Sequence, residues 1–238
     1  MMLNDREEKK IDCLQFFYLA VMRKFEDSYR HKGLRKKLID LIKQKHISDD
    51  KVLDAMMNVP RHFFLDTALD HNAYEDKAFP IAEGQTISQP YTVAYQTQLL
   101  QIKPYDKILE IGTGSAYQET DLEEIGAQCF TIERQKKLYD HKKEFSFLKK
   151  YNNIKVFYGD GFEGLPTYAP FDKILITAAA PLIPPRLIEQ LKIGGKMVLP
   201  LDKGEHQQML RITKMEDGNL EEEAFENFSF VPMLKGKR

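Results

Sequence analysis

KILEIGTGSAY, residues 107–117, is the stretch that decides the fold class. Its apolar strand, 108–111, runs directly into a turn that carries Gly112 and Gly114. Glycine lets the backbone turn sharply and approach a bound ligand, and the helix that follows would direct its first amide groups at that ligand. A tight strand-to-helix turn without a ligand has the same local pattern. The stretch alone therefore predicts a strand-turn-helix unit and leaves a cofactor site open.

Further apolar strands follow at intervals typical of alternating strands and helices. They are 128–133 (QCFTIE), 154–160 (IKVFYGD), 171–179 (FDKILITAA) and 196–201 (KMVLPL). Between them lie an amphipathic run over 135–150 and a helix between the proline pair 184–185 and the glycine pair 194–195. This repetition predicts an α/β fold with a doubly wound, mainly parallel sheet.

The C-terminal part carries a hairpin pattern. A strand over 207–215 is followed by a turn at Asp217 and Gly218 and by a strand-like stretch that reaches Met233. Two such strands joined by a short turn predict an antiparallel hairpin at the edge of the sheet.

The N-terminal part carries a helical pattern. Leu34, Leu38 and Leu41 recur at spacings of three and four residues, and Ser48 offers an N-cap to a helix over 49–58. We expect one domain over 1–238, made of an N-terminal extension (1–26), a helical substrate-side region (27–106) and a cofactor-binding sheet (107–238). The extension has apolar residues at helical spacing, which predicts packing onto the domain, although translation could also start at Met22.

The composition excludes several classes of protein. With 238 residues, 42% of them apolar, the chain can bury the core of one domain. Its net charge of −1 provides no basic field for a phosphate backbone, so nucleic acid is not an expected partner. Cys13 and Cys129 are too few for a zinc cluster or a disulfide framework, and no apolar run reaches membrane-spanning length. We expect a monomer in the cytoplasm, without a metal, a membrane anchor or a secretory signal.

Acidic residues at the ends of two later strands point to the same ligand site. Glu133 lies about 20 residues after Gly112, the spacing at which a carboxylate can accept ribose hydroxyls. Asp160, followed by Gly161, ends the next strand, and ligands of open parallel sheets bind outside the carboxyl ends of the strands. Either acid could instead be an ordinary helix cap. Their convergence predicts a nucleoside-sized ligand.

The charge around the glycine turn distinguishes two cofactor classes. A pyrophosphate-binding turn has a third glycine where this chain has Tyr117. Glu110, just before the turn, would repel a pyrophosphate but attract the cationic methionine end of a sulfonium cofactor. The pattern therefore favours S-adenosylmethionine over a dinucleotide.

A second site is predicted by QTISQP, residues 85–90. Pro90 suits the first turn of a helix, so 86–89 would form a loop rich in hydrogen-bond donors at a helix N-terminus, suited to a carboxylate. The alternative is a plain helix cap made by Ser88.

Several segments together resemble the protein-L-isoaspartate O-methyltransferase family. They are 58–64 (NVPRHFF), 73–81 (AYEDKAFPI), 85–90 (QTISQP), 110–118 (EIGTGSAYQ), 132–134 (IER), 159–161 (GDG), 178–181 (AAAP) and 191–200 (LKIGGKMVLP). The resemblance implies a Rossmann-like methyltransferase fold and S-adenosylmethionine as methyl donor, with S-adenosylhomocysteine as its product. It also implies a damaged protein or peptide carrying L-isoaspartate as the methyl acceptor.

The resemblance also assigns residues to roles. Ser88 is the active-site residue. Substrate-binding positions are Thr86, Ile87, Gln89 and Pro90. Cofactor-binding positions are Glu110, Gly112, Gly114, Glu133, Asp160 and Gly161, with Gln208 as a C-terminal glutamine that helps to close the site.

The chain departs from the family after the glycine turn. Ala116 replaces a glycine, and Asp121 and Glu123 replace apolar or small residues. A methyl group at 116 is strained if φ is positive, and a carboxylate at 121 is costly if it is buried. These changes keep one alternative open, a weak or silent binding protein for damaged chains. A methyltransferase for another substrate or a nucleotide-dependent oxidoreductase on the same fold is a further alternative, and QTISQP argues against it.

Overall fold

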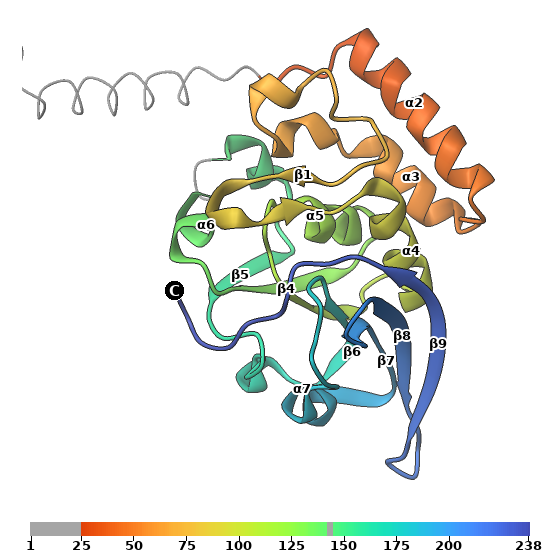
Figure 1. Cartoon of the computed structure of the whole chain (residues 1–238), viewed down its shortest axis with the longest axis vertical. Coiled ribbons are helices and arrows are strands. Elements are labelled where there is room, and N and C mark those ends of the chain that lie inside the picture. Colours follow the sequence, from red (N-terminus) through yellow and green to blue (C-terminus); the bar gives the residue numbers. More distant parts are fainter. Residues whose placement is uncertain (1–24, 142–144) are drawn as a thin grey trace, which may run out of the picture.

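A computed structural model of the chain describes residues 25–141 and 145–238. At its centre is a seven-stranded sheet in the order β5-β4-β3-β6-β7-β8-β9 (Figure 1). The strands are β3 (Lys107–Ile111), β4 (Gln128–Glu133), β5 (Ile154–Tyr158), β6 (Phe171–Ile176), β7 (Leu191–Asp202), β8 (Gln207–Lys214) and β9 (Leu220–Phe228). Strands β3 to β7 are parallel, and β8 and β9 are antiparallel. The predicted α/β fold with a C-terminal hairpin is confirmed.

The sheet is covered on both faces. Leu109 and Ile111 of β3 belong to one apolar core, and Ile108 between them belongs to the core on the other face. Alternate side chains of a strand point to opposite faces, so a continuous apolar strand suits a sheet buried on both sides. Helices α4 (Pro90–Leu100) and α5 (Tyr117–Glu124) contribute to the second core and α7 (Pro185–Gln190) to the first.

The N-terminal helices form a further layer above α4 and α5 (Figure 1). Helix α2 (Tyr29–Gln44) is capped by Ser28, and α3 (Asp50–Asn58) packs against α2, α4 and α5. The prediction of Ser48 as the N-cap of α3 is wrong: the N-cap is the next residue, Asp49, whose carboxylate accepts a hydrogen bond from the Lys51 amide. Residues 1–24, with the predicted apolar stripe and Met22, lie outside the described residues.

Three other element boundaries differ from the prediction. Helix α7 ends at Gln190 because β7 begins at Leu191, and the glycine pair 194–195 lies inside that strand. The run over 135–150 contains α6 (Lys136–His141) and a 3₁₀ helix (Ser146–Lys150), with 142–144 not described. Strand β9 ends at Phe228 rather than near Met233, because the following segment leaves the hairpin and bonds to the loop after β6.

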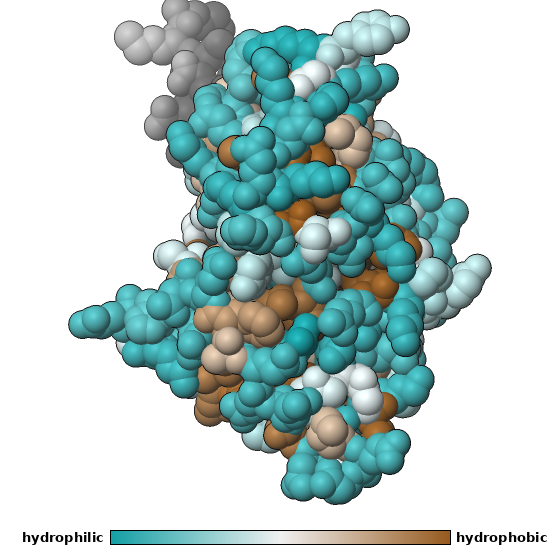
Figure 2. All heavy atoms as spheres, turned by 90° about the vertical axis from the view of Figure 1, so that its right-hand side faces the viewer, coloured by the Kyte–Doolittle hydropathy of each residue, from teal (hydrophilic) through white to brown (hydrophobic). Residues whose placement is uncertain are grey.

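Figure 2 shows the face over α2, α4 and β9, which is mainly hydrophilic, with apolar atoms in small separate areas. No helix of the described part of the chain is long and apolar enough to cross a membrane. Between the N-terminal layer and the sheet runs a two-stranded ribbon, β1 (Phe79–Pro80) paired with β2 (Thr86–Ile87). This ribbon carries the QTISQP segment to the edge of the sheet.

Candidate active site

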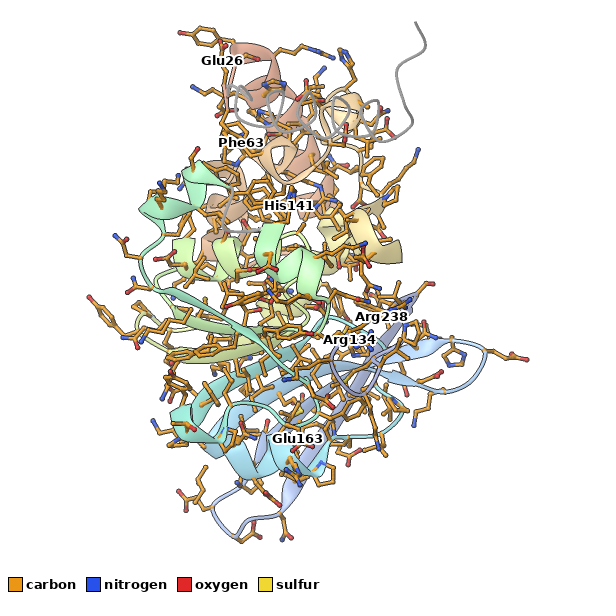
Figure 3. All side chains as sticks on the ribbon, turned by 90° about the vertical axis from the view of Figure 1, so that its left-hand side faces the viewer. Glu26, Phe63, Arg134, His141, Glu163 and Arg238 are labelled. Atoms are coloured by element: carbon orange, nitrogen blue, oxygen red, sulfur yellow. The ribbon has the colours of Figure 1, made fainter. Side chains whose placement is uncertain are left out.

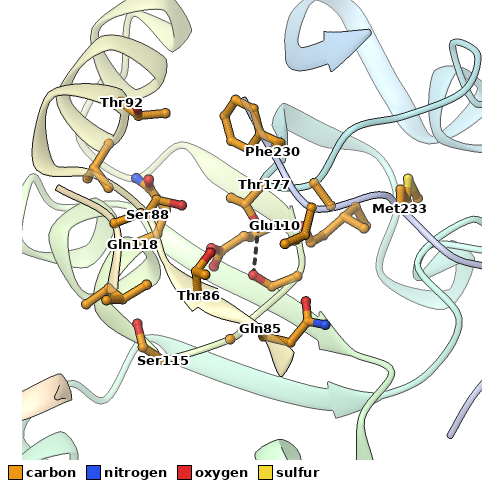
Figure 4. A pocket seen from close by; sticks show the side chains of 18 of the residues that line it. Gln85, Thr86, Ser88, Thr92, Glu110, Ser115, Gln118, Thr177, Phe230 and Met233 are labelled. Atoms are coloured by element: carbon orange, nitrogen blue, oxygen red, sulfur yellow. Dashed lines mark hydrogen bonds between the residues drawn. The ribbon is translucent and has the colours of Figure 1, made fainter. Parts of the chain in front are cut away.

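A cavity of about 590 Å³ lies at the carboxyl ends of β3, β4 and β6. This volume is within the range of small-molecule sites. The sheet order places it beside β3, where the chain turns from winding outward through β4 and β5 to winding the other way through β6 and β7. Ligands of doubly wound sheets bind at this point. Figure 4 shows Thr86 and Ser88 on one side of the cavity, Phe230 and Met233 on the other, and Glu110 and Thr177 between them.

The glycine turn after β3 forms the floor of this cavity. Gly112 and Gly114 have φ angles of 100° and 51°, which side chains other than glycine rarely adopt. Thr177 donates its hydroxyl to the carbonyls of Ile111 at 2.9 Å and Gly112 at 2.8 Å. A Cβ atom on Gly112 would lie 2.6 Å from that hydroxyl oxygen. The turn therefore needs glycine at 112 for both its conformation and its packing.

Glu133, at the end of β4, connects the turn to the neighbouring strand. Its carboxylate accepts the Gly114 amide at 2.9 Å and the Gln135 amide at 2.7 Å. The side chain is only 4% exposed and lines the cavity. Each carboxylate oxygen has two acceptor positions, so each can still accept a ligand hydroxyl. Glu133 is thus more than a helix cap, because it also holds the glycine turn and lines the cavity.

Glu110 places a second carboxylate in the cavity wall. It belongs to β3, is 1% exposed, and pairs in register with Thr131 and Leu175 of the adjacent strands. A buried carboxylate next to the glycine turn repels phosphate groups and attracts cationic ones. This geometry agrees with the sequence argument for a cationic cofactor.

Ser88 lies where the β1-β2 ribbon joins α4. Ile87, 2% exposed, anchors the ribbon in the N-terminal core, and the next residue, Ser88, lines the cavity. The N-cap of α4 is Gln89, without a side-chain capping bond, and Pro90 occupies the first turn. The interpretation of Ser88 as a plain helix cap is therefore wrong. Thr86, Ile87 and Gln89 also line the cavity, whereas Pro90 does not.

Two predicted cofactor residues do not line the cavity. Asp160 accepts the Phe162 amide at 2.9 Å and the Gly236 amide at 2.7 Å, although the adjacent Gly161 is a lining residue. Gln208 lies within β8 and is not a lining residue, although its partner on β9, Asn227, lines the cavity. The end of β9 and the segment after it line this side of the cavity, and the role of Gln208 in closing the site stays a prediction.

This C-terminal segment was not predicted as part of the site. Phe228, Phe230, Val231 and Met233 line the cavity, and Ala179 exchanges two backbone bonds with the segment. The chain end is held by Arg134, whose carbonyl accepts the Arg238 amide at 2.8 Å, and Figure 3 shows these two residues together. Thr177 was missed as well, although it follows an apolar strand as Glu133 does.

The sequence profile of the family described as "Protein-L-isoaspartate(D-aspartate) O-methyltransferase" matches residues 33–238. The chain belongs to this family. Proteins named protein-L-isoaspartate O-methyltransferase include relatives from Cytophaga hutchinsonii, 51% identical over 88% of this chain and 94% of the relative, and from Pseudomonas paraeruginosa, 42% identical over 85% and 96%. The resemblance inferred from the sequence is confirmed.

Solved structures agree with the family assignment. A putative isoaspartate methyltransferase from Plasmodium falciparum, in complex with S-adenosyl-L-homocysteine, has a TM-score of 0.73 and 25% identity, covering 85% of this chain and 99% of that one. A second structure, titled protein-L-isoaspartate O-methyltransferase, has a TM-score of 0.75 at 24% identity, covering 83% and 65%. The second similarity supports the fold alone.

The residues at which the chain departs from the family do not line the cavity. Ala116 has φ of 78° and is buried, so the predicted strain is present. Asp121 is 1% exposed and lies one turn after Tyr117, on the side of α5 that meets the N-terminal layer. Burial raises the pKa of Asp121 well above its ordinary value, and Arg61 opposes this shift. Glu123 accepts the Asn153 amide at 2.8 Å.

One cluster of potential metal ligands lies away from the cavity. Within the described residues, Asp27, His31 and His62 bring ligand atoms within 4.8 Å of one another. The two imidazole rings are stacked, 3.8 Å apart, and both nitrogens of each ring have hydrogen-bond partners in the protein. A metal ion would have to displace these bonds, which join the two rings to other residues of the N-terminal layer.

Proposed function

We propose that this chain transfers the methyl group of S-adenosylmethionine to the α-carboxylate of L-isoaspartyl residues in damaged proteins, and that Ser88 positions this carboxylate. One observation carries the proposal: Ser88 of the QTISQP segment lines the same cavity as Glu133 and the glycine turn. Residues assigned to the substrate and residues assigned to the cofactor thus line one cavity.

The cavity suits a sulfonium nucleoside. Glu133 presents a carboxylate for the ribose hydroxyls, Gly112 and Gly114 allow close backbone approach, and Glu110 adds negative charge near the turn. S-adenosylmethionine would supply an electrophilic methyl group when bound. Gly161 would contact the nucleoside from the end of β5, with Asp160 behind it, whereas Gln208 has no part in the proposal.

The chemistry requires orientation rather than a base. The isoaspartyl carboxylate is already ionised at neutral pH. In agreement with this, no histidine of the described residues lines the cavity. The protein must hold one carboxylate oxygen in line with the methyl group and exclude water, which strengthens the attraction between anion and sulfonium.

Ser88 is suited to hold this carboxylate. It is half-buried, and within the described residues its hydroxyl has no hydrogen-bond partner, so it is free to donate to a substrate oxygen. After methyl transfer the ester would be attacked by the following backbone nitrogen of the substrate, releasing methanol and forming a succinimide. Hydrolysis of the succinimide would restore some normal aspartate.

Support for catalysis over silent binding comes from the altered residues. Ala116, Asp121 and Glu123 are the reason for considering a silent protein, and none of them lines the cavity. The net charge of −1 argues against a nucleic-acid partner, and the low cysteine content suits a reducing cytoplasm. We propose that it works there as a monomer, without nucleic acid, membrane or metal.

The test is Ser88→Ala, with Ser28→Ala as matched control because Ser28 is a true helix cap. Ser88→Ala should slow single-turnover methyl transfer by about 100- to 1000-fold, the loss typical of one preorganised donor. Affinity for S-adenosylhomocysteine, measured by calorimetry, should stay nearly unchanged. Ser28→Ala should instead cost about 1 kcal/mol of stability and leave turnover intact. Normal turnover of folded Ser88→Ala would refute the role of Ser88.

A further inference from the structure

Arg61 is a fully buried cation in the middle of the N-terminal layer. It opens the 3₁₀ helix Arg61–Phe64, and its side chain is 0% exposed. The guanidinium donates to three backbone carbonyls: Ala73 at 3.1 Å, Lys77 at 3.3 Å and Ser88 at 2.8 Å. Every one of these acceptors belongs to the segment that leads into or forms the substrate-side loop.

The same guanidinium also contacts the cofactor side. It lies 5.0 Å from the centre of the Tyr117 ring, and Tyr117 is the first residue of α5, directly after the glycine turn. Arg61 therefore touches the backbone of Ser88 and the helix that follows Gly114, yet it does not line the cavity.

Asp121 is close enough to this cation to interact with it electrostatically. Burial lowers the pKa of Arg61, and the neighbouring Tyr117 and Asp121 oppose that shift. Tyr117 and Asp121 are one turn apart on the same face of α5, the face toward Arg61. Asp121, which departs from the family pattern, thus lies near the arginine and does not line the cavity.

A buried cation is costly, and an apolar side chain would fill the same core more favourably unless the charge has a task. Planar guanidinium is suited to such a task because it can bond several acceptors in fixed directions and stack on a ring. Here it connects the loop that carries Ser88 to the start of α5, and these two segments are remote in sequence but both line the cavity.

We propose that Arg61 is a positioning residue for methyl transfer: it fixes the backbone of Ser88 relative to the first turn of α5. The proposal rests on the proposed role of Ser88. Because misplacement of a reacting group by about 1 Å can cost about 100-fold in rate, loss of the three carbonyl bonds should be visible in turnover. Cofactor affinity should change little, since the bond between Glu133 and the Gly114 amide does not involve Arg61.

The experiment compares Arg61→Met with Arg35→Met. Arg35 is also a buried arginine of the N-terminal layer, 5% exposed, and it bonds Asp27 and Tyr74 but neither Ser88 nor α5. Each variant is assayed for melting temperature, for S-adenosylhomocysteine affinity and for single-turnover transfer to a saturating isoaspartyl peptide. Arg61→Met should lose about 10- to 100-fold in rate per folded molecule, with affinity within about threefold. Arg35→Met should lose stability only. Equal rates for the two variants would overturn the proposal.

Two further variants keep the test decisive. If Arg61→Met does not fold, Arg61→Lys retains the charge beside Asp121 but cannot reach all three carbonyls, and it should show the same rate loss.

The double variant Arg61→Met/Ser88→Ala should be no slower than Ser88→Ala alone, because the effects of residues that act through one another are not additive. Additive losses would contradict positioning through Ser88. Normal turnover of Ser88→Ala together with slow Arg61→Met would remove the role of Ser88 and leave the loop-fixing role of Arg61.

Discussion

Replacing Glu133 with glutamine tests how one carboxylate serves both the protein and the ligand. The carboxylate accepts the Gly114 and Gln135 amides at 2.9 and 2.7 Å, and it is nearly buried. A glutamine of the same shape keeps one oxygen but turns an NH₂ group toward one of the two amides. That amide loses its acceptor, at a cost of about 1–3 kcal/mol.

The loss should be measurable without any cofactor. For a chain of this size, about 1 kcal/mol lowers the melting temperature by roughly 2–4 °C. The matched control is Glu123→Gln, since Glu123 also accepts a backbone amide but does not line the cavity. Glu133→Gln should melt earlier than the parent protein, whereas Glu123→Gln keeps an oxygen for its one amide partner and should melt close to it.

Only Glu133→Gln should weaken the cofactor. Hydrogen bonds to a charged group contribute about 1 kcal/mol more than neutral ones, so two ribose hydroxyls should cost about 2 kcal/mol, or roughly 30-fold in Kd. Titration calorimetry with S-adenosylhomocysteine measures this directly. Unchanged affinity together with a lowered melting temperature would show that Glu133 serves the glycine turn alone, and the proposed ribose contact would be refuted.

Two further predictions concern stability. Ala116→Gly should relieve about 1–2 kcal/mol of left-handed backbone strain, but it removes a buried methyl group that contributes about 0.8 kcal/mol. The free energy of unfolding, measured with denaturant, should therefore rise by less than about 1 kcal/mol, and the cofactor affinity measured by calorimetry should not change. A fall of more than about 1 kcal/mol in the free energy of unfolding would contradict the assigned strain. Burial lowers the pKa of His62 below its ordinary value of 6.5, so the folded protein resists protonation of this ring. The protein should therefore lose stability as the pH falls from about 6.5 toward 5, and His62→Gln should reduce this loss in melting curves. The same pH dependence of the melting temperature in both proteins would contradict the role of His62.

The local parts of this structure were predictable from the sequence. Short-range sequence patterns were enough to predict the strand-turn-helix unit at Gly112, the carboxylate of Glu133 at a strand end and the helix start at Pro90. The expected ligand side also followed, because parallel strands direct their carboxyl ends to one edge of the sheet.

The remaining features depend on contacts between distant segments. The residues after Phe228 line the cavity only because they bond to Ala179, and nothing in their own pattern indicates this pairing. In the sequence, Arg61 is only a basic residue next to a proline, and its contacts with Ser88 and Tyr117 are formed by the fold. Gln208 shows the reverse case, since a motif match gave it a role at the site, whereas in β8 it pairs with the lining residue Asn227 and does not line the cavity itself.

The central claim is methylation of isoaspartyl carboxylates, and the most direct measurement is transfer of a radiolabelled methyl group from S-adenosylmethionine. Two peptides of identical sequence are compared, one with L-isoaspartate and one with normal L-aspartate at a single position. We expect base-labile label on the isoaspartyl peptide and essentially none on its twin, and Ser88→Ala should abolish most of the difference. Equal labelling of the two peptides, or no labelling at saturating cofactor by protein that binds S-adenosylhomocysteine, would contradict the proposed function.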